Sequence, residues 1–228
     1  MRAPLSIVIP TLNAEEDLPE TLAALMEGLA AGLVRELVIS DGGSHDGTGA
    51  IAEAAGATLV TGAASRGGQL RRGVEASGGD WLLLLHADTH LSPGWTVAVG
   101  SMIEAGAKDQ AGYFKLRFRS ARRAAALVAG WANLRSRVFG LPYGDQGLLV
   151  PRALLDHLGG VPDLPLMEDV ALARALRGKL KPLPVEAATS FVRYERAGVL
   201  NRGGRNLGLL MRYLAGASPQ DLSDRYRG

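Results

Sequence analysis

Apolar residues form two alternating patterns along the first ninety residues. Short apolar or β-branched runs, each of the length of a buried strand, occupy residues 6–10, 36–40, 57–60 and 81–85. The segments between them, residues 14–31, 47–55 and 67–76, favour helices, and the clearest stripe consists of Leu18, Leu22, Leu25 and Leu29. Strands separated by helices of this length predict an α/β fold with a parallel sheet and right-handed crossovers.

The second half of the chain is less regular. Its patterns predict helices over 93–105, 121–138, 167–177 and 206–214, and short strands over 113–118 and 147–150. Pro151 is expected in the first turn of a helix, and residues 191–194 are expected to return to the sheet. The chain shows no internal repeat and no low-complexity linker, so a single domain over residues 1–228 is the simplest organisation.

Composition removes several classes of chemistry. The chain has no cysteine, which excludes disulfides, thiolate metal ligands and a cysteine nucleophile. Its four histidines are too scattered for an all-protein zinc site. The first residues already have the pattern of a core strand, so we expect no signal peptide, and no apolar run approaches the roughly 20 residues of a membrane-spanning helix.

The basic residues are unevenly spread although the net charge is only +2. Between Gln110 and Gly144 the chain has seven Lys or Arg residues and no acid. Such a block is typical either of a solvated helix face or of a surface for an anionic partner. The helix expected around Arg122 and Arg135 could meet an anionic membrane, and Trp131 would then lie either in its apolar face or in the core.

Acidic residues stand where predicted strands end or where a helix begins. Asp41 follows the second strand and precedes two glycines, which suits either a tight turn or a ligand approached by backbone. Asp88 follows the fourth strand and either caps a turn or holds Mg²⁺ or Mn²⁺. Glu168 and Asp169 open a helix, where they interact favourably with its dipole or supply a general base. In an open α/β sheet, ligands bind at the carboxyl ends of the strands.

Two further segments have either a binding or a structural explanation. The helix start at Ser65–Gln69, with Arg66, could hold a diphosphate or form an ordinary glycine-rich turn. Asp145 and Gln146 could hydrogen-bond a sugar or acceptor, or could only shape a turn.

In order, the Pro10-Thr-x-Asn13 loop, the Asp41-Gly-Gly-Ser turn, His86-Ala-Asp-Thr89 and Met167-Glu-Asp169 resemble the motifs of family-2 glycosyltransferases. The resemblance covers roughly residues 5 to 200. Within the family, the chain most resembles small soluble bacterial members that carry His-Ala-Asp-Thr and Leu-Met-Glu-Asp. The resemblance implies the GT-A fold, a Rossmann-like, mostly parallel central sheet flanked by helices. Residues 1 to about 90 would then form the nucleotide-sugar-binding half, and residues from about 91 to 228 would form the acceptor-binding half.

The resemblance also implies a reaction and a set of site residues. The reaction is an inverting, metal-dependent, non-processive transfer of a single sugar from a UDP- or GDP-sugar to an acceptor hydroxyl. Asp169 would be the catalytic base, Glu168 would orient the base or the acceptor, and Asp88 would bind Mg²⁺ or Mn²⁺. The donor site would comprise Pro10, Thr11, Asn13, Asp41, Gly42, Arg66, Gln69, His86, Ala87 and Asp88. The acceptor site would comprise Asp145, Gln146 and Arg193.

This sequence departs from the family pattern at two places. His86 replaces the first acid of the usual Asp-x-Asp, and it could bind ribose, phosphate or metal, or be a core residue. The Gln-x-x-Arg-Trp motif of processive synthases is missing, and Arg193-Tyr194 is its nearest counterpart. The resemblance therefore indicates single-sugar transfer.

Two other functions are weighed against this one. A catalytically inactive nucleotide-sugar-binding homologue is suggested by His86, whereas Asp88 and Asp169 argue against it. A sugar-1-phosphate nucleotidyltransferase would need glycine and lysine after the first strand, where this chain has Thr11–Glu16. We expect a cytoplasmic protein, peripheral at most at the inner membrane face, with a small-molecule or lipid-linked acceptor and no nucleic-acid partner. The apolar C-terminal stretch also suits a homodimer contact.

Overall fold

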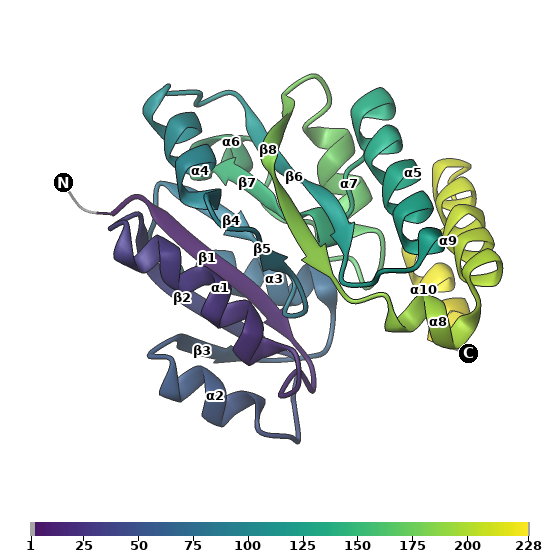
Figure 1. Cartoon of the computed structure of the whole chain (residues 1–228), viewed down its shortest axis with the longest axis horizontal. Helices are drawn as coiled ribbons and strands as arrows, with labels where there is room; N and C mark the ends of the chain where they lie inside the picture. The colour runs from purple at the N-terminus through teal and green to yellow at the C-terminus, as the bar shows by residue number, and fades with distance from the viewer. Residues whose placement is uncertain (1–2, 228) are drawn as a thin grey trace.

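A computed structural model describes residues 3–227 as one sheet of eight strands with helices on both faces (Figure 1). The strand order is β3-β2-β1-β4-β7-β6-β8-β5. In chain order the strands are β1 (Leu5–Thr11), β2 (Val34–Asp41), β3 (Thr58–Thr61), β4 (Trp81–Leu84), β5 (His90–Leu91), β6 (Ala111–Phe118), β7 (Leu148–Pro151) and β8 (Leu180–Thr189).

The four N-terminal strands pair in parallel, as the sequence predicts. β7 pairs antiparallel with both β4 and β6, while β8 runs parallel to β6 and antiparallel to β5. The sheet is therefore mostly parallel, and its antiparallel pairs lie in the second half of the chain.

The helices cover the sheet as the alternation of side chains along the strands requires. Leu5, Ile7 and Ile9 of β1 point to one face, and Val8 points to the other. The first face is covered by α1 (Leu18–Ala30), α2 (Thr48–Ala54) and α4 (Trp95–Glu104). The second face is covered by α3 (Arg66–Glu75), α6 (Arg152–His157) and α7 (Glu168–Ala175).

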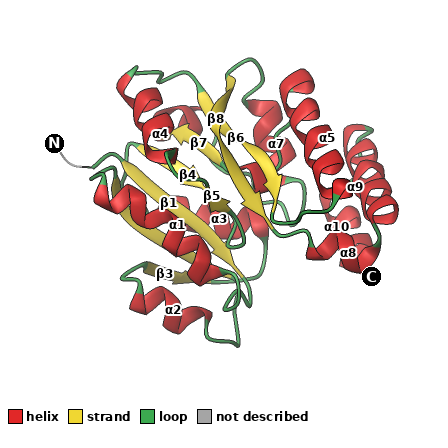
Figure 2. Cartoon of the chain, viewed as in Figure 1, coloured by secondary structure: helices red, strands yellow, loops and turns green. Residues whose placement is uncertain are grey.

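The remaining helices gather at one end of the sheet, beyond β6 (Figure 2). They are α5 (Arg123–Phe139), α8 (Val192–Ala197), α9 (Val199–Leu214) and α10 (Pro219–Arg227), and a 3-10 turn, η1 (Gly144–Gln146), precedes β7. No helix within residues 3–227 combines the length and the hydropathy that crossing a bilayer requires.

Three expectations about secondary structure need correction. Residues 191–194 are not a strand: they enter α8, where Phe191 and Tyr194 pack on Phe118 with ring centroids 5.0 and 5.5 Å away. The strand that returns to the sheet is β8, which the sequence conceals because Pro182 and Pro184 lie inside it. Helix α1 starts at Leu18 rather than at Ala14, with Pro19 in its first turn, where proline needs no amide partner.

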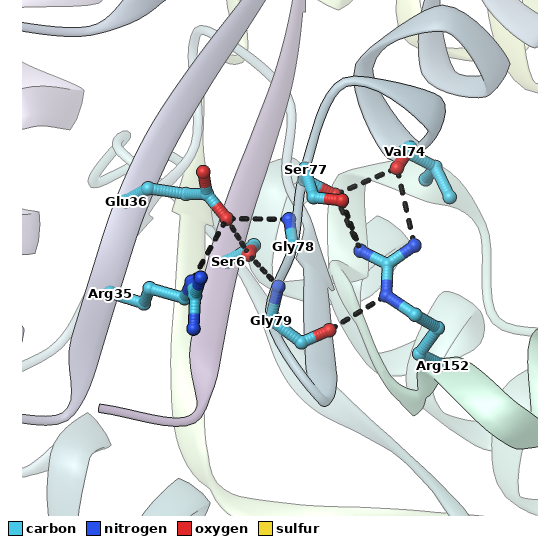
Figure 3. A network of polar contacts seen from close by, with 8 residues as sticks. All are labelled: Ser6, Arg35, Glu36, Val74, Ser77, Gly78, Gly79 and Arg152. Carbon is cyan, nitrogen blue, oxygen red and sulfur yellow. Dashed lines mark hydrogen bonds and ion pairs between the residues drawn. The ribbon is translucent and has the colours of Figure 1, made fainter. Parts of the chain in front are cut away.

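A polar network joins the strands at the edge opposite their carboxyl ends (Figure 3). The hydroxyl of Ser6 donates to Glu36 Oε1 at 2.5 Å and accepts from the amide of Gly79 at 2.8 Å. The guanidinium of Arg152 donates to three carbonyl oxygens, those of Val74, Ser77 and Gly79. These contacts tie the starts of β1, β2 and β4 to the start of α6.

Candidate active site

The carboxyl ends of β1, β2 and β4 lie at one edge of the sheet because these strands are parallel. The segments 11–14, 41–44 and 86–89 follow these strands, and the N-termini of α3, α7 and α8 reach the same edge. Two adjoining cavities open there.

The larger of the two, which we call the donor cavity, has a volume of about 350 Å³. It is lined by eight of the ten residues predicted for the donor: Pro10, Thr11, Asn13, Arg66, Gln69, His86, Ala87 and Asp88. Much of the remaining wall consists of Leu12, Asp17, Pro165, Leu166, Arg193 and Ser223. The sequence motifs thus converge on one space although they come from separate loops.

The second space, which we call the catalytic cavity, has a volume of about 140 Å³. Asp88, Asp145 and Asp169 all line it, so the predicted metal ligand, acceptor residue and base lie around one space. Five residues line both cavities: Arg66, His86, Asp88, Leu166 and Arg193. A ligand that spans the two would therefore meet two arginines and Asp88 at their junction.

His86 stands at this junction as a neutral side chain. Burial and the nearby Arg66 guanidinium lower the pKa of His86 to about 4. Its ring packs on Gly144 so closely that a Cβ at Gly144 would lie 2.4 Å from Nε2. A neutral imidazole can donate one hydrogen bond and accept another. This position therefore offers a hydrogen-bonding group and no negative charge.

Glu168 and Asp169 occupy different environments although they are adjacent. Met167, with a left-handed φ of 67°, immediately precedes α7, and the two carboxyl groups at the start of the helix have different surroundings. Asp169 lines the catalytic cavity, where its Oδ2 accepts a hydrogen bond from the amide of Gly144 at 2.9 Å. Glu168 is buried, and burial together with the Asp169 charge raises the pKa of Glu168 to about 7. Two carboxyl groups with such different surroundings are suited to different roles.

Asp145 lies in η1 and lines the catalytic cavity. Its Oδ1 is buried and has no hydrogen-bond partner among residues 3–227. Burial raises the pKa of Asp145 to about 6, although the Arg135 charge opposes the shift. An unsatisfied carboxyl oxygen at a cavity wall is available to a ligand hydroxyl.

Asp41 and Gly42, which are also predicted for the donor, do not line either cavity. The Asp41 carboxylate accepts hydrogen bonds from Thr11 Oγ1 at 2.9 Å and from Ser44 Oγ at 2.6 Å, and further bonds from the amides of Gly43 and Ser44. Burial raises the pKa of Asp41, but these bonds outweigh it and lower the pKa below the usual value. In the structure Asp41 shapes the turn after β2, and a contact with base or ribose stays a prediction.

Gln69 and Gln146 both have their side-chain amides engaged inside the protein. Gln69 Nε2 donates to the carbonyls of Thr11 at 2.7 Å and Ser40 at 3.0 Å, which holds the ends of β1 and β2 together. Gln146 is fully buried, accepts from Ser136 Oγ at 2.5 Å, and lines neither cavity. Its role as an acceptor residue stays a prediction.

The N-terminus of α3 combines the two explanations that its sequence allows. Ser65 caps the helix by accepting from the amide of Gly68 at 3.3 Å, and the amide of Gly67 donates to the Leu164 carbonyl at 3.1 Å. These two amides are therefore already used within the protein. Arg66, in contrast, lines both cavities, so it is the diphosphate-binding candidate of this segment.

No group of three or more His, Cys, Asp or Glu residues within 3–227 could enclose a metal ion. The residues at the junction nevertheless fit Mg²⁺ or Mn²⁺, because Asp88 lines both cavities and such an ion takes one or two carboxylates together with substrate phosphate oxygens. A divalent cation would then be bound jointly by Asp88 and a diphosphate.

Several lining residues escaped the sequence analysis. They are Tyr143, Thr189, Ser190, Arg202 and Asn206, and Tyr194 was named there only as part of the counterpart of a missing motif. Arg202 and Asn206 are four residues apart and so lie on one face of α9, which is the one local signal for two of them. The others depend on how β8, α8 and η1 fold back onto the site.

Known proteins resemble this chain in sequence and in fold. Residues 6–113 match the model of the family described as Glycosyl transferase family 2. This segment, a little under half of the chain, is similar to that family. No curated protein sequence matches this chain.

Solved structures share its fold. One crystal structure of S. aureus TarS superposes with a TM-score of 0.66 at 16% identity, over 82% of this chain and 36% of TarS. A TarS 1–349 structure with UDP-GlcNAc gives a TM-score of 0.64 at 17% identity, over 82% and 58%. Glucosyl-3-phosphoglycerate synthase from Mycobacterium tuberculosis with Mn²⁺, UDP and glucosyl-3-phosphoglycerate gives 0.56 at 22% identity, over 82% and 70%. This likeness confirms the GT-A fold. The chain spans 36% and 58% of the length of the two TarS chains.

Proposed function

We propose that this glycosyltransferase moves a single hexose from a nucleotide-diphosphate sugar to an acceptor hydroxyl, with inversion and without processive elongation. The observation that supports this most directly is the junction of the two cavities. Asp88 and Asp169 line the same catalytic cavity, and Arg66, His86 and Arg193 connect that cavity to the donor cavity. A donor lying across the junction would put its diphosphate beside Asp88 and its sugar toward Asp169.

The donor half of the proposal depends on charge and shape. The nucleotide would occupy the donor cavity beside Thr11 and Asn13, and Arg66 and Arg193 would face the diphosphate. Mg²⁺ or Mn²⁺ bound through Asp88 would offset the negative charge that grows on the leaving diphosphate. Neutral His86 would hydrogen-bond a ribose hydroxyl or a phosphate oxygen without adding repulsion.

The reaction is a single displacement at the anomeric carbon. The acceptor oxygen forms the new C–O bond, and the bond from that carbon to the diphosphate oxygen breaks on the opposite face. Asp169 takes the proton of the attacking hydroxyl, while the Gly144 amide holds its carboxylate in place. Glu168, whose pKa is raised to about 7 by burial and the Asp169 charge, retains its proton more readily and orients Asp169 or the acceptor. No enzyme nucleophile is needed for this chemistry.

The choice of probes follows from the structural relatives. S. aureus TarS has been crystallised with UDP-GlcNAc, and glucosyl-3-phosphoglycerate synthase with UDP and Mn²⁺. UDP-sugars are therefore the first donors to test, with GDP-sugars second. The acceptor is a small molecule or a lipid-linked one. We place the protein in the cytoplasm, peripheral to the inner face of the membrane.

The test is calorimetric titration of UDP, GDP and CMP, each with and without Mn²⁺, on the wild type and on Asp88→Ala. We expect one nucleotide to bind tightly only with Mn²⁺, and the Asp88→Ala protein to lose that dependence. Binding that is equal with and without Mn²⁺ would contradict the metal role of Asp88. No binding under any condition would favour a protein that has lost its catalytic function.

A further inference from the structure

A deep apolar groove runs between α5 and α9 at the end of the sheet where Figure 1 shows the two helices side by side. Its volume is about 900 Å³, the largest of the three spaces described here. α5 contributes Leu127, Trp131 and Phe139, and α9 contributes Leu200, Leu207 and Met211. The groove is therefore an apolar channel on the surface rather than a polar cleft.

The side chains that line this groove are exposed to an unusual degree. Trp131, which could have been a core residue, is 55% exposed, and Leu127 and Leu200 are 75% and 91% exposed. Single exposed apolar residues are ordinary, but a contiguous apolar patch of this kind marks a binding surface. Folding alone gives no reason to keep these side chains in water.

The groove leads directly into the catalytic cavity. Four residues line both spaces: Tyr143, Asp145, Tyr194 and Asn206. At this passage the Arg135 guanidinium stacks 3.4 Å above the ring centroid of Tyr143, and Arg202 lies 5.7 Å from that of Tyr194. A molecule lying in the groove would therefore pass between two arginine–tyrosine pairs before it reached Asp169.

The two helices that flank the groove carry charge of one sign, and the acid Asp145 lines it only where it meets the catalytic cavity. α5 contains Arg123, Arg135 and Arg137, α9 contains Arg202, Arg205 and Arg212, and neither helix has an acidic residue. This arrangement complements an anionic ligand. It disfavours a second copy of the same face, because a twofold contact would bring two positively charged helix pairs together.

We propose that the groove binds the hydrocarbon chain of an anionic lipid acceptor, and that the polar head of this lipid extends into the catalytic cavity. The proposal rests on the function proposed above and selects the lipid-linked class of acceptor. Arg135 and Arg202 would face the anionic head, while the chain would replace water along Leu127, Trp131 and Leu207. The hydroxyl to be glycosylated would then lie beside Asp169.

Two glycines keep the wall of the groove open. Gly203 and Gly204 line it in the middle of α9, and a Cβ built on either meets no other group within 4 Å. Gly208 has equally open surroundings but does not line the groove. Leucine at Gly203 would fill the groove, whereas leucine at Gly208 is a matched control in the same helix.

The experiment uses decyl phosphate as the probe, with inorganic phosphate and decanol as comparisons, on the full chain. Binding is followed by calorimetry and by tryptophan emission, because Trp81 and Trp95 are buried and Trp131 alone of the three tryptophans is exposed. We expect decyl phosphate to bind and to shift the Trp131 emission to the blue, inorganic phosphate to give no shift, and decanol to bind more weakly. Gly203→Leu should weaken decyl phosphate at least about tenfold, and Gly208→Leu should not.

A second variant keeps the test decisive if Gly203→Leu does not fold. Leu127→Ser changes an exposed side chain of α5 and should weaken decyl phosphate by about threefold to tenfold. Binding that neither variant weakens would overturn the proposal. So would a dimer, seen by sedimentation velocity, that Gly203→Leu dissociates, because a second copy would then occupy the groove. If decanol bound as tightly as decyl phosphate, the proposal that the site recognises an anionic head group would be wrong.

The outcomes separate this proposal from the proposed function. Failure of decyl phosphate to bind while UDP and Mn²⁺ bind normally would remove the lipid and leave the transferase reaction. If no nucleotide bound while decyl phosphate bound in the groove, the proposed transferase reaction would be wrong and the lipid site would stand.

Discussion

The parallel part of the sheet buries its apolar side chains, whereas the α5–α9 pair leaves many of its own exposed. In the first, β1 and β4 bury nearly every side chain between helices, with Ile7, Ile9 and Leu83 almost completely covered. In the second, α5 and α9 leave Leu127, Trp131, Leu200 and Met211 largely in water. Because burying apolar area stabilises a fold, apolar side chains that stay exposed indicate a function other than folding.

The two regions also differ in how they use charge. At the amino ends of the strands, Glu36 and Arg152 form a closed network with Ser6 and nearby backbone groups. In contrast, two carboxyl groups near the site each keep a buried oxygen without a hydrogen-bond partner among residues 3–227. They belong to Asp145, at the wall of the catalytic cavity, and to Glu168, which adjoins Asp169 but does not line that cavity. A satisfied network stabilises structure, whereas unsatisfied groups at a cavity wall are available to a ligand.

The largest effect is expected from Asp169→Asn, which removes the proposed base without changing its size. The asparagine cannot take a proton, so kcat should fall by about 10²–10⁴-fold while nucleotide affinity stays within about twofold. Steady-state assays and calorimetry on the same preparation measure both. Turnover that survives the change would show that Asp169 is not the base, and Glu168→Gln would then be the variant to compare.

The next effect concerns stability at the opposite edge of the sheet. Arg152→Met removes the donor to the carbonyls of Val74, Ser77 and Gly79, so the free energy of unfolding should fall by about 2–3 kcal/mol. Urea denaturation measures this loss. Nucleotide binding below the unfolding transition should be unchanged because the network is remote from both cavities.

The control for Arg152 is Arg71, an arginine whose ion pair lies on the surface. Arg71 pairs with Glu75 at 3.0 Å on the surface of α3, and both side chains are more than half exposed. Arg71→Met should change the free energy of unfolding by less than about 0.5 kcal/mol. Equal losses in the two variants would mean that the network of Figure 3 adds nothing beyond a surface ion pair.

A matched pair of helix glycines sharpens the comparison of the two regions. A Cβ on Gly73 of α3 would lie 2.4 Å from Val8 Cγ1 in the core, so Gly73→Ala should destabilise the protein by about 1–3 kcal/mol. A Cβ on Gly204 of α9 meets nothing, so Gly204→Ala should stabilise it by about 0.5–1 kcal/mol. Thermal unfolding of both variants is the measurement, and a loss for Gly204→Ala would show that α9 is more tightly packed than it appears.

A further effect is a pH dependence of stability that originates in Glu168. Burial raises the pKa of Glu168 from 4.5 to about 7 in the folded protein, so between these values the folded state holds a proton that the unfolded state has released. The contribution of Glu168 to stability is therefore fully present below about pH 4.5 and is lost as the pH rises through 7, at no more than about 1.4 kcal/mol per pH unit.

Comparison of the wild type with Glu168→Gln isolates this contribution. The difference between their urea midpoints should move in favour of the variant as the pH rises from 5 to 7.5. Other groups, among them Asp145 with its pKa near 6, titrate in both proteins and cancel in the difference. A difference that does not change with pH would show that Glu168 titrates normally.

The sequence by itself determined the elements of the first ninety residues and the position of the donor motifs. Periods of two and of 3.6 residues are local properties, so the strands β1 to β4 and the helices between them were predicted within a few residues. The parallel order then brings the ends of β1 and β4 to one edge, which is why Thr11, His86 and Asp88 could be grouped in advance.

Only the tertiary structure decided the rest of the site. Pro182 and Pro184 hide β8 from any local pattern, and β8 pairs with β6, some 70 residues away in the chain. Tyr143, Tyr194 and Arg202 reach the catalytic cavity from three separate elements. The groove is likewise invisible in the sequence, because the apolar stripes of α5 and α9 look like ordinary core-facing stripes. Whether such a stripe is covered depends on packing between distant segments, which no local pattern encodes.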